Sequence, residues 1–318
     1  PRRLGLQRRT WRGSRVRQVP DGEDRASVSL ASLVHRSPTH ESGFLLGRFA
    51  AGYLRFAEAL RPAHCADVST PSLEAFKSVA LETAIAAGDL LAKGAQMKVN
   101  DSTDDDVKMQ ADVDSEHLVR ALLKATGIPV IGEELGGDAS LFDGNELYWV
   151  VDPLDGTYNY LRRQPATCVS LGLMRGSEPV LGVIHNFTAN KTYLGVVGEG
   201  TFINGQRHTP GWVDQIGDAC IMTGFPALAD KSAPAMAVFM GQVSRYKKIR
   251  MIGSAALALA YVGEGVADTY YESGTNLWDV AAGLAIIKAS GGHYRLVPTG
   301  KRPLNYDLWA SAKEEWTR

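Results

Sequence analysis

The stretch that most constrains this chain is Trp149–Tyr160, WVVDPLDGTYNY, in which an apolar run ends in two aspartates separated by a proline and a leucine. Residues 148–151 have the length and residue types of a buried strand. Asp152 therefore follows the carboxyl end of a strand, which is where layered α/β folds place their ligand sites. The segment predicts a binding site at the edge of a buried sheet.

The residues after Asp152 indicate the chemistry of that site. Pro153 has no N–H to donate, so it is expected to end the strand ladder and to direct Asp152 and Asp155 toward a common point. Gly156 permits a close turn, and Thr157 is expected to cap a helix whose free N–H groups favour an anion. Two carboxylates beside an anion site suit Mg²⁺ that bridges to a phosphoryl group. A strand-end aspartate or an Asx turn would explain either aspartate alone.

Two further acidic positions repeat this pattern. Glu133 and Glu134, in IGEEL, follow the apolar residues 128–131 at the end of another predicted strand. Asp279, in LWDVAAG, stands at the start of a predicted helix, where its ordinary role would be that of an N-cap. Each position has a structural explanation by itself, and only the set of them favours a metal site.

The charge distribution favours metal cations over nucleic acid as partners. The 318 residues carry a net charge of -1, but seven arginines precede the first acidic residue, Asp21, and without them the remainder carries about -8. Three cysteines, with no C-x-x-C pair and no histidine spacing suited to zinc, favour a reducing, cytoplasmic compartment. No apolar run approaches the roughly 20 residues of a membrane span, so a membrane is not an expected partner.

Residues 1–70 are expected to form an N-terminal extension, outside a catalytic domain at 71–318. The first 40 residues are rich in arginine and serine and poor in acidic residues, a composition typical of an organellar transit peptide. A disordered tail, or sequence upstream of the true start, would have the same composition. An organellar location is therefore the alternative to a cytoplasmic one.

Helices and strands are mixed along the chain, which predicts an α/β or α+β fold with layered sheets. Apolar residues recur at helical spacing in residues 43–62, 73–96, 111–126, 254–265 and 278–292. Strand patterns occupy residues 148–151, 167–174, 180–185, 192–197 and 267–273. Polar turns between 186 and 205 predict antiparallel hairpins, and the acidic residues 101–106 predict a turn between two short strands.

Three motifs in order carry a resemblance to a known family: GEE at 132–134, WVVDPLDGTYNY at 149–160, and LWDVAAG at 277–283 followed by ASGG. From about residue 72 to 312 the chain resembles the inositol monophosphatase family of Mg²⁺-dependent, lithium-sensitive phosphomonoesterases. The resemblance implies a layered α-β-α-β-α sandwich of the inositol monophosphatase/fructose-1,6-bisphosphatase type, and a homodimer. It also implies that metal-activated water hydrolyses a small phosphorylated substrate, with no covalent phosphoenzyme.

The resemblance further implies roles for single residues. Two or three Mg²⁺ ions would be held by Glu133, Asp152, the Leu154 carbonyl, Asp155 and Asp279. Glu133 and Thr157 would orient and activate the attacking water, and Asp112, rather than Asp114, would support Thr157. The phosphate would bind at Asp155, Gly156 and Thr157.

The residues that would line the pocket for the alcohol part of the substrate favour a hydroxyl-rich alcohol such as inositol. Glu272 matches a family glutamate that accepts hydrogen bonds from ring hydroxyls, and Gly253, Ser254 and Ala255 resemble the G-T-A wall of the pocket. The chain departs from the family's pattern after the Gly-Thr pair, where Arg162 and Arg163 could favour a second anionic group. Histidinol-phosphate phosphatase and 3′(2′),5′-bisphosphate nucleotide phosphatase therefore remain alternatives. A regulator that binds metal or phosphate without turnover is a further alternative.

Overall fold

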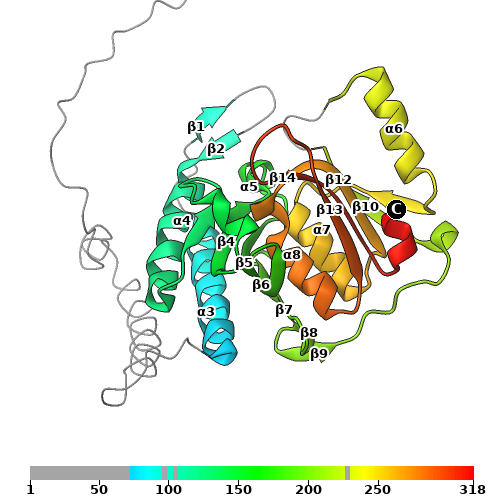
Figure 1. The fold of residues 1–318 in the computed structure, drawn as a ribbon. Coiled ribbons are helices and arrows are strands. Elements are labelled where there is room, and N and C mark those ends of the chain that lie inside the picture. Colours follow the sequence, from blue (N-terminus) through cyan, green and yellow to red (C-terminus); the bar gives the residue numbers. More distant parts are fainter. Residues whose placement is uncertain (1–71, 95–98, 103–106, 226–229) are drawn as a thin grey trace, which may run out of the picture. The chain divides into compact units, whose positions relative to one another are not determined.

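A computed structural model describes residues 72–94, 99–102, 107–225 and 230–318. The predicted helix at 43–62, and with it the N-terminal extension, lies outside the described residues. The described part forms five layers: a helix pair, a seven-stranded sheet, a second helix pair, a five-stranded sheet and an outer helix (Figure 1). This arrangement confirms the predicted α-β-α-β-α sandwich.

The seven-stranded sheet has the order β3-β4-β5-β6-β7-β8-β9. Its strands are β3 Val130–Gly132, β4 Leu147–Asp155, β5 Cys168–Arg175, β6 Glu178–Asn186, β7 Lys191–Val196, β8 Gly200–Ile203 and β9 Gln206–His208. Only β3 and β4 run parallel in this sheet, and each later neighbour pairs antiparallel. The polar turns between 186 and 205 predict this for the hairpins from β6 to β9. The parallel pair matters for function, because it brings the carboxyl ends of two strands to one edge.

The five-stranded sheet has the order β11-β10-β12-β14-β13. Its strands are β10 Cys220–Thr223, β11 Lys248–Arg250, β12 Thr269–Asn276, β13 His293–Pro298 and β14 Asn305–Ser311. A separate hairpin joins β1 Val99–Ser102 to β2 Val107–Met109, and the acidic residues 103–106 between them lie outside the described ranges. The two strands predicted around the acidic turn are therefore present.

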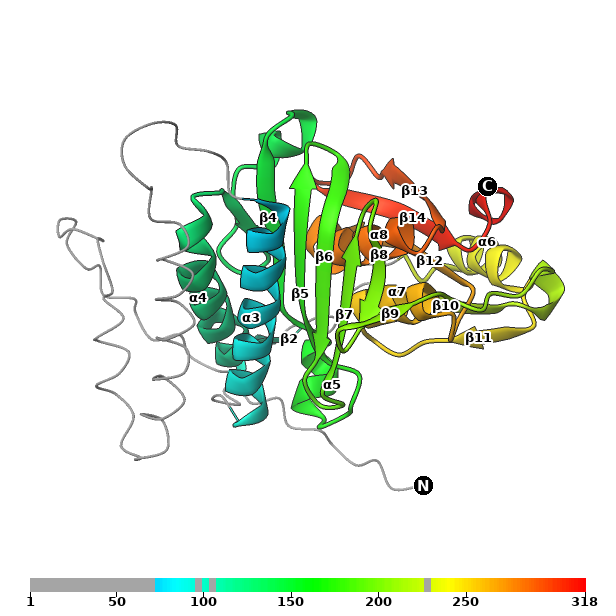
Figure 2. The ribbon, with the colours of Figure 1, turned by 90° about the horizontal axis from the view of Figure 1, so that it is seen from below.

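The helices of the described residues are α3 Leu73–Ala92, α4 Gln110–Leu123, α5 Thr157–Leu161, α6 Ala233–Val243, α7 Ala255–Glu264 and α8 Leu277–Ala289, with short 3-10 turns at Lys124–Thr126, Ala139–Asp143, Ile216–Asp218 and Glu314–Thr317. Helices α3, α4, α7 and α8 lie where the apolar spacing predicts them, α5 begins at the Gly-Thr turn, as predicted, and α6 was not predicted. Helices α3 and α4 cover the outer face of the seven-stranded sheet, and α7 and α8 lie between the two sheets (Figure 2). Helix α6 covers the outer face of the five-stranded sheet, where Phe239 and Val243 pack near Tyr271.

A row of three glycines lets α8 lie directly on the seven-stranded sheet. Gly172 on β5 pairs with Gly182 on β6, and Gly182 pairs with Gly195 on β7, so the row crosses three neighbouring strands. A Cβ at Gly182 would lie 2.7 Å from the Cα of Ala282 on α8, closer than packed carbon atoms approach. The absence of these side chains fixes how close α8, with Asp279 in its first turn, comes to β4 and its neighbours.

Candidate active site

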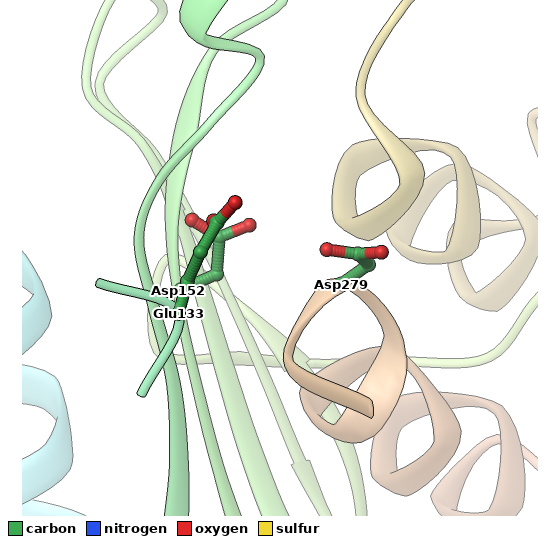
Figure 3. A group of neighbouring side chains, drawn as sticks. All are labelled: Glu133, Asp152 and Asp279. Carbon is green, nitrogen blue, oxygen red and sulfur yellow. The ribbon is translucent and has the colours of Figure 1, made fainter. Parts of the chain in front are cut away.

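Three carboxylates from three separate elements point toward one another (Figure 3). Glu133 follows β3, Asp152 lies in β4, and Asp279 lies in the first turn of α8. Each offers an oxygen, and these oxygens lie within 4.8 Å of one another. Because Gly132 pairs with Val151 in the parallel ladder, Glu133 and Asp152 leave the same sheet edge side by side.

Strand β4 contains a bulge directly after Asp152. The expectation that Pro153 ends the strand is therefore wrong. Strand β4 continues to Asp155, but three residue steps from Asp152 to Asp155 face only two steps on β5. Pro153 and Leu154 together face the single residue Val169 in this bulge, and bulges are positions where proline, which has no N–H, is tolerated. The carbonyl of Pro153 accepts a 3.0 Å hydrogen bond from Ser115 Oγ, and Asp152 Oδ1 accepts one from the Leu154 N–H at 3.0 Å. The segment from Asp152 to Asp155 is thus held at several points.

Asp155 lies beside this group and binds the start of α7. Its Oδ2 accepts hydrogen bonds from Ser254 Oγ at 2.6 Å and from the Ala256 N–H at 2.7 Å. The thiol of Cys168 lies 3.7 Å from the same oxygen. The hydrogen bond from Ser254 places the predicted wall of Gly253–Ala255 directly against Asp155. All three of these contacts are made by Oδ2 and none by Oδ1, the other carboxylate oxygen of Asp155.

Thr157 is the first residue of α5 rather than its cap. Gly156 takes the N-cap position with φ of 89°, in the left-handed region, so the expectation that Thr157 caps the helix is wrong. The Thr157 hydroxyl instead lies 2.9 Å from Asp112 Oδ1 and 3.2 Å from the Leu154 carbonyl. Asp112 is fixed in turn, because its Oδ2 accepts the Met109 N–H at 3.0 Å at the start of α4. The predicted pair of Thr157 and Asp112 is therefore present.

Burial and mutual repulsion raise the pKa values of these carboxyls. Burial is the largest cause in every case, and it raises the pKa of Asp112 to about 6, of Asp279 to about 7 and of Glu272 to about 8. The pKa of Asp152 is raised well above its usual range by burial and then by Glu133, Asp155 and Asp279. The N-cap of α8 is Asn276, and Asp279 is the third residue of the helix. Asp279 Oδ2 accepts a 2.7 Å hydrogen bond from the Asn276 N–H, so Asp279 is part of a capping box and is not the N-cap itself.

This donor set fits a divalent cation. In the described part of the chain, neither Asp152, Asp155 nor Asp279 forms an ion pair with a lysine or arginine. Buried carboxylates without such partners are costly unless they are protonated or share a cation. Hard oxygen ligands from carboxylates are the ones that Mg²⁺ prefers.

Glu272 lies on β12 at the opposite wall of the site. Its Oε2 accepts a 2.8 Å hydrogen bond from Tyr270 Oη, and the negative charges of Asp279 and Asp155 add to the rise in its pKa. Gly224 lies against it, because a Cβ there would be 2.5 Å from Glu272 Oε2. Glu272, the residue predicted to contact the substrate, therefore lies near Asp155 and Asp279. Its Oε1 is the oxygen that does not accept the hydrogen bond from Tyr270.

Two supporting residues escaped the sequence reasoning. The Asn159 amide donates to the carbonyls of Ala166 at 2.8 Å, Ile252 at 2.8 Å and Gly253 at 3.1 Å, which ties α5 to the Gly253 wall. Nothing local in the sequence indicates these bonds, since two of the partners lie more than 90 residues away.

Glu116 is the second of these residues. It is fully buried on α4 and accepts the N–H groups of Glu134 at 2.8 Å and Leu135 at 3.2 Å. Its Oε1 also accepts a 2.7 Å hydrogen bond from Arg120 Nε, which neutralises the buried charge. The i, i+4 spacing of Glu116 and Arg120 was the available signal, and it would have indicated a helix pair only. In the structure this pair fixes the loop that carries Glu133.

Oxygen ligands for a cation, beside a hydroxyl and a glycine turn suited to a phosphate, define the class of metal-dependent phosphatases. Comparison with known proteins gives the family. A profile described as the inositol monophosphatase family matches residues 72–316, and the chain belongs to this family. It is accordingly a phosphoric monoester hydrolase that acts on small phosphorylated substrates.

Relatives of known name span most of the same region. The fructose-1,6-bisphosphatase/inositol-1-monophosphatase of Aquifex aeolicus is 31% identical over 233 residues, which cover 71% of this chain and 87% of the relative. The inositol monophosphatase of Mesembryanthemum crystallinum is 34% identical over 230 residues, covering 69% and 84%. The crystal structure of the extragenic suppressor protein SuhB from Bartonella henselae superimposes with a TM-score of 0.67 at 28% identity, covering 76% of this chain and 95% of that one.

Within residues 72–318, apart from the three short gaps, no helix combines the length and the apolar composition that a membrane crossing requires.

Proposed function

We propose that the chain is a Mg²⁺-dependent phosphomonoesterase that hydrolyses inositol monophosphate or a related small polyol phosphate. The observation that carries this proposal is the convergence of Glu133, Asp152 and Asp279 from three elements, next to the hydrogen-bonded pair of Thr157 and Asp112. The catalytic domain in this proposal is residues 71–318.

The metal ligands in this proposal are Glu133, Asp152, the Leu154 carbonyl, Asp155 and Asp279. The three converging carboxylates supply three oxygens, and Asp155 supplies Oδ1, since its Oδ2 is engaged by Ser254 and Ala256. Two or three ions would share these groups. Bound Mg²⁺ would neutralise charge on the phosphoryl oxygens and lower the pKa of a water molecule.

The attacking water is oriented by Thr157 and Glu133. Because the Thr157 hydroxyl donates its proton to Asp112, its lone pairs remain to accept a hydrogen bond from water. Glu133 offers a second acceptor for a water proton from the side of β3. Asp112 touches neither water nor substrate in this scheme, so it is a positioning residue that sets the direction of the Thr157 hydroxyl.

The alcohol part of the ester binds between two walls. Gly156 and Thr157 hold the phosphate on one side, with Asp155 next to them. Gly253, Ser254 and Ala255 form a second wall, kept in place by the hydrogen bond between Ser254 and Asp155. Glu272 Oε1 accepts a hydrogen bond from a ring hydroxyl, because Oε2 already accepts one from Tyr270.

Phosphate release from a panel of esters tests the proposal. The panel contains inositol 1-phosphate, histidinol phosphate, 3′-phosphoadenosine 5′-phosphate and fructose 1,6-bisphosphate, each with Mg²⁺, without it, and with Li⁺ added. We expect preference for the inositol ester, dependence on Mg²⁺ and inhibition by Li⁺. Preference for another ester would leave the metal chemistry in place and overturn the substrate assignment, whereas release of phosphate from any ester without a divalent cation would overturn the chemistry.

We further propose that the protein is a homodimer in a reducing compartment, the cytoplasm or an organelle. This rests on the family resemblance and on the residue pattern of the first 40 positions. Light scattering of the purified chain would test the dimer, and a monomer at micromolar concentration would refute it. Imaging of the tagged chain in its native cell would decide the compartment.

A further inference from the structure

One face of α4 contacts three separate segments of the active site. Residues three and four apart lie on the same side of a helix, so Asp112, Ser115 and Glu116 share a face of α4, and all three are buried. Asp112 accepts the Thr157 hydroxyl, and Ser115 donates to a carbonyl in the bulge of β4. Glu116 reaches the third segment, the loop that carries Glu133. A single helix therefore holds all three segments.

Glu116 binds the backbone on both sides of Glu133. Its Oε2 accepts the Glu134 N–H at 2.8 Å, and its Oε1 accepts the Leu135 N–H at 3.2 Å. The carboxylate also lies against the residue before Glu133, because a Cβ at Gly132 would be 2.5 Å from Glu116 Cδ. Carbon atoms do not pack so closely, so position 132 has no room for a side chain while Glu116 is in place.

Arg120 supplies three donors to the same loop and to Glu116. Its Nε donates to Glu116 Oε1 at 2.7 Å, its Nη1 to the Val130 carbonyl at 3.2 Å, and its Nη2 to the Gly136 carbonyl. Val130 precedes Glu133 and Gly136 follows it, so the guanidinium spans the loop. A guanidinium is a planar fork of fixed geometry, whereas an ammonium is a single point charge. Arg120 therefore fixes the ends of the loop as well as neutralising Glu116.

We propose that Glu116 and Arg120 are positioning residues that hold Glu133 at its distance from Asp152 and thereby set the affinity of the site for its divalent cation. The proposal rests on the proposed function, in which both carboxylates are metal ligands. Their oxygens lie within 4.8 Å of each other, and Ser115 ties the segment after Asp152 to the same helix. Glu116 and Arg120 themselves contact neither the cation nor the substrate.

Glu116→Gln is the first test, because it keeps the shape of the side chain. Both oxygens of Glu116 accept N–H donors, so the amide NH₂ must face a donor in either orientation. Calorimetric titration of the full chain with Mn²⁺, which takes the same oxygen ligands as Mg²⁺, measures the affinity for a cation without turnover. We expect the dissociation constant for Mn²⁺ to rise about 10–100-fold, as it does when the residues that orient metal ligands are lost.

Arg120→Lys is the second test, because it keeps the positive charge beside Glu116 and loses the fork. It should raise the dissociation constant for Mn²⁺ in the same direction. In both variants, phosphate release from inositol 1-phosphate should need more Mg²⁺ to reach its half-maximal rate. The KM for the ester at saturating Mg²⁺ should stay that of the wild type, because the residues proposed to bind the alcohol part are unchanged.

Leu123→Ala is the matched control. Leu123 is fully buried further along α4, in the core that this helix forms with the seven-stranded sheet. Its loss leaves a cavity and should lower the melting temperature, but the dissociation constant for Mn²⁺ should equal that of the wild type.

Unchanged Mn²⁺ affinity in Glu116→Gln and Arg120→Lys, or an equal loss of affinity in Leu123→Ala, would overturn the positioning role, as would absence of Mn²⁺ binding by the wild type. Binding of Mn²⁺ by the wild type without hydrolysis of any ester would overturn the proposed function. The ratio of dissociation constants would then still decide the role of Glu116 and Arg120, so the two proposals can fail separately.

Discussion

Replacing Gly182 by alanine should move α8 away from the sheet and lower both stability and turnover. A Cβ at Gly182 would lie 2.7 Å from the Ala282 Cα and 2.8 Å from its carbonyl carbon, and both atoms belong to the helix backbone. Carbon atoms pack at about 3.5–4.0 Å, so the helix must move by about 1 Å. Overpacking of this kind costs about 1–3 kcal/mol.

The displacement should also reach the chemistry, because Asp279 lies in the first turn of the same helix. A shift of about 1 Å in a catalytic group can reduce the rate about 100-fold. We expect Gly182→Ala to lower the melting temperature by about 2–4 °C for each kcal/mol lost, and to lower kcat at saturating Mg²⁺. Thermal unfolding and phosphate release measure the two effects.

Gly241→Ala is the control for this experiment. Gly241 lies in α6, where nothing is within 4 Å of an added Cβ, and alanine favours a helix more than glycine does. This variant should be as stable as the wild type or more so, with unchanged turnover. If Gly182→Ala unfolds and turns over like Gly241→Ala, the close packing of α8 on the glycine row does not position Asp279.

Three other variants test single contacts. Asp112→Asn should lower kcat about 10–100-fold with little change in KM, as loss of a supporting hydrogen bond does at metal sites. Asp114→Asn is the control, because it affects only a 2.8 Å hydrogen bond from Gln110, and its kcat should match that of the wild type. Equal kcat values for the two variants would refute the positioning role of Asp112. Asn159→Ala removes an amide whose two hydrogens are shared among three carbonyls and should cost about 1–3 kcal/mol in urea unfolding, so an unchanged midpoint would contradict this role. The pKa of Glu272 is about 8 in the folded protein and 4.5 ordinarily, so between these pH values the folded state binds more protons than the unfolded state. With a chelator present, the free energy of unfolding should therefore fall as the pH rises from about 4.5 to about 8. Glu272→Gln should flatten that slope, and a slope as steep as in the wild type would show that another group causes it.

The sequence predicts the parts of this fold that depend on neighbouring residues. The apolar spacing of residues 73–96 reflects which side of α3 is buried, and the apolar residues of 278–292 reflect the burial of α8 on nearly every side between the two sheets; both patterns are local. The strand at 148–151 is likewise visible from its residue types, but its end is not. Pro153 was expected to end β4, whereas pairing with β5 continues through a bulge to Asp155, because partner strands outside the local segment decide where pairing stops.

The candidate site divides in the same way. The acidic residues at strand and helix ends were visible as single positions, and the family resemblance supplied the set that the structure brings together at Glu133, Asp152 and Asp279. The supports of the site were not visible. Asn159 bonds to carbonyls more than 90 residues away, and the row at Gly172, Gly182 and Gly195 has meaning only once three strands lie side by side.

The central claim is that the converging carboxylates hold the cation needed for phosphate release. The most direct measurement is the initial rate of phosphate release from inositol 1-phosphate as a function of Mg²⁺ concentration, for the wild type and Asp152→Asn. Folding of the variant can be checked by its melting temperature in the presence of a chelator, which should not fall, because the change removes a buried charge that its neighbours repel. The account predicts that Asp152→Asn is folded and has no Mg²⁺-dependent turnover, whereas near-normal turnover in this variant would contradict it.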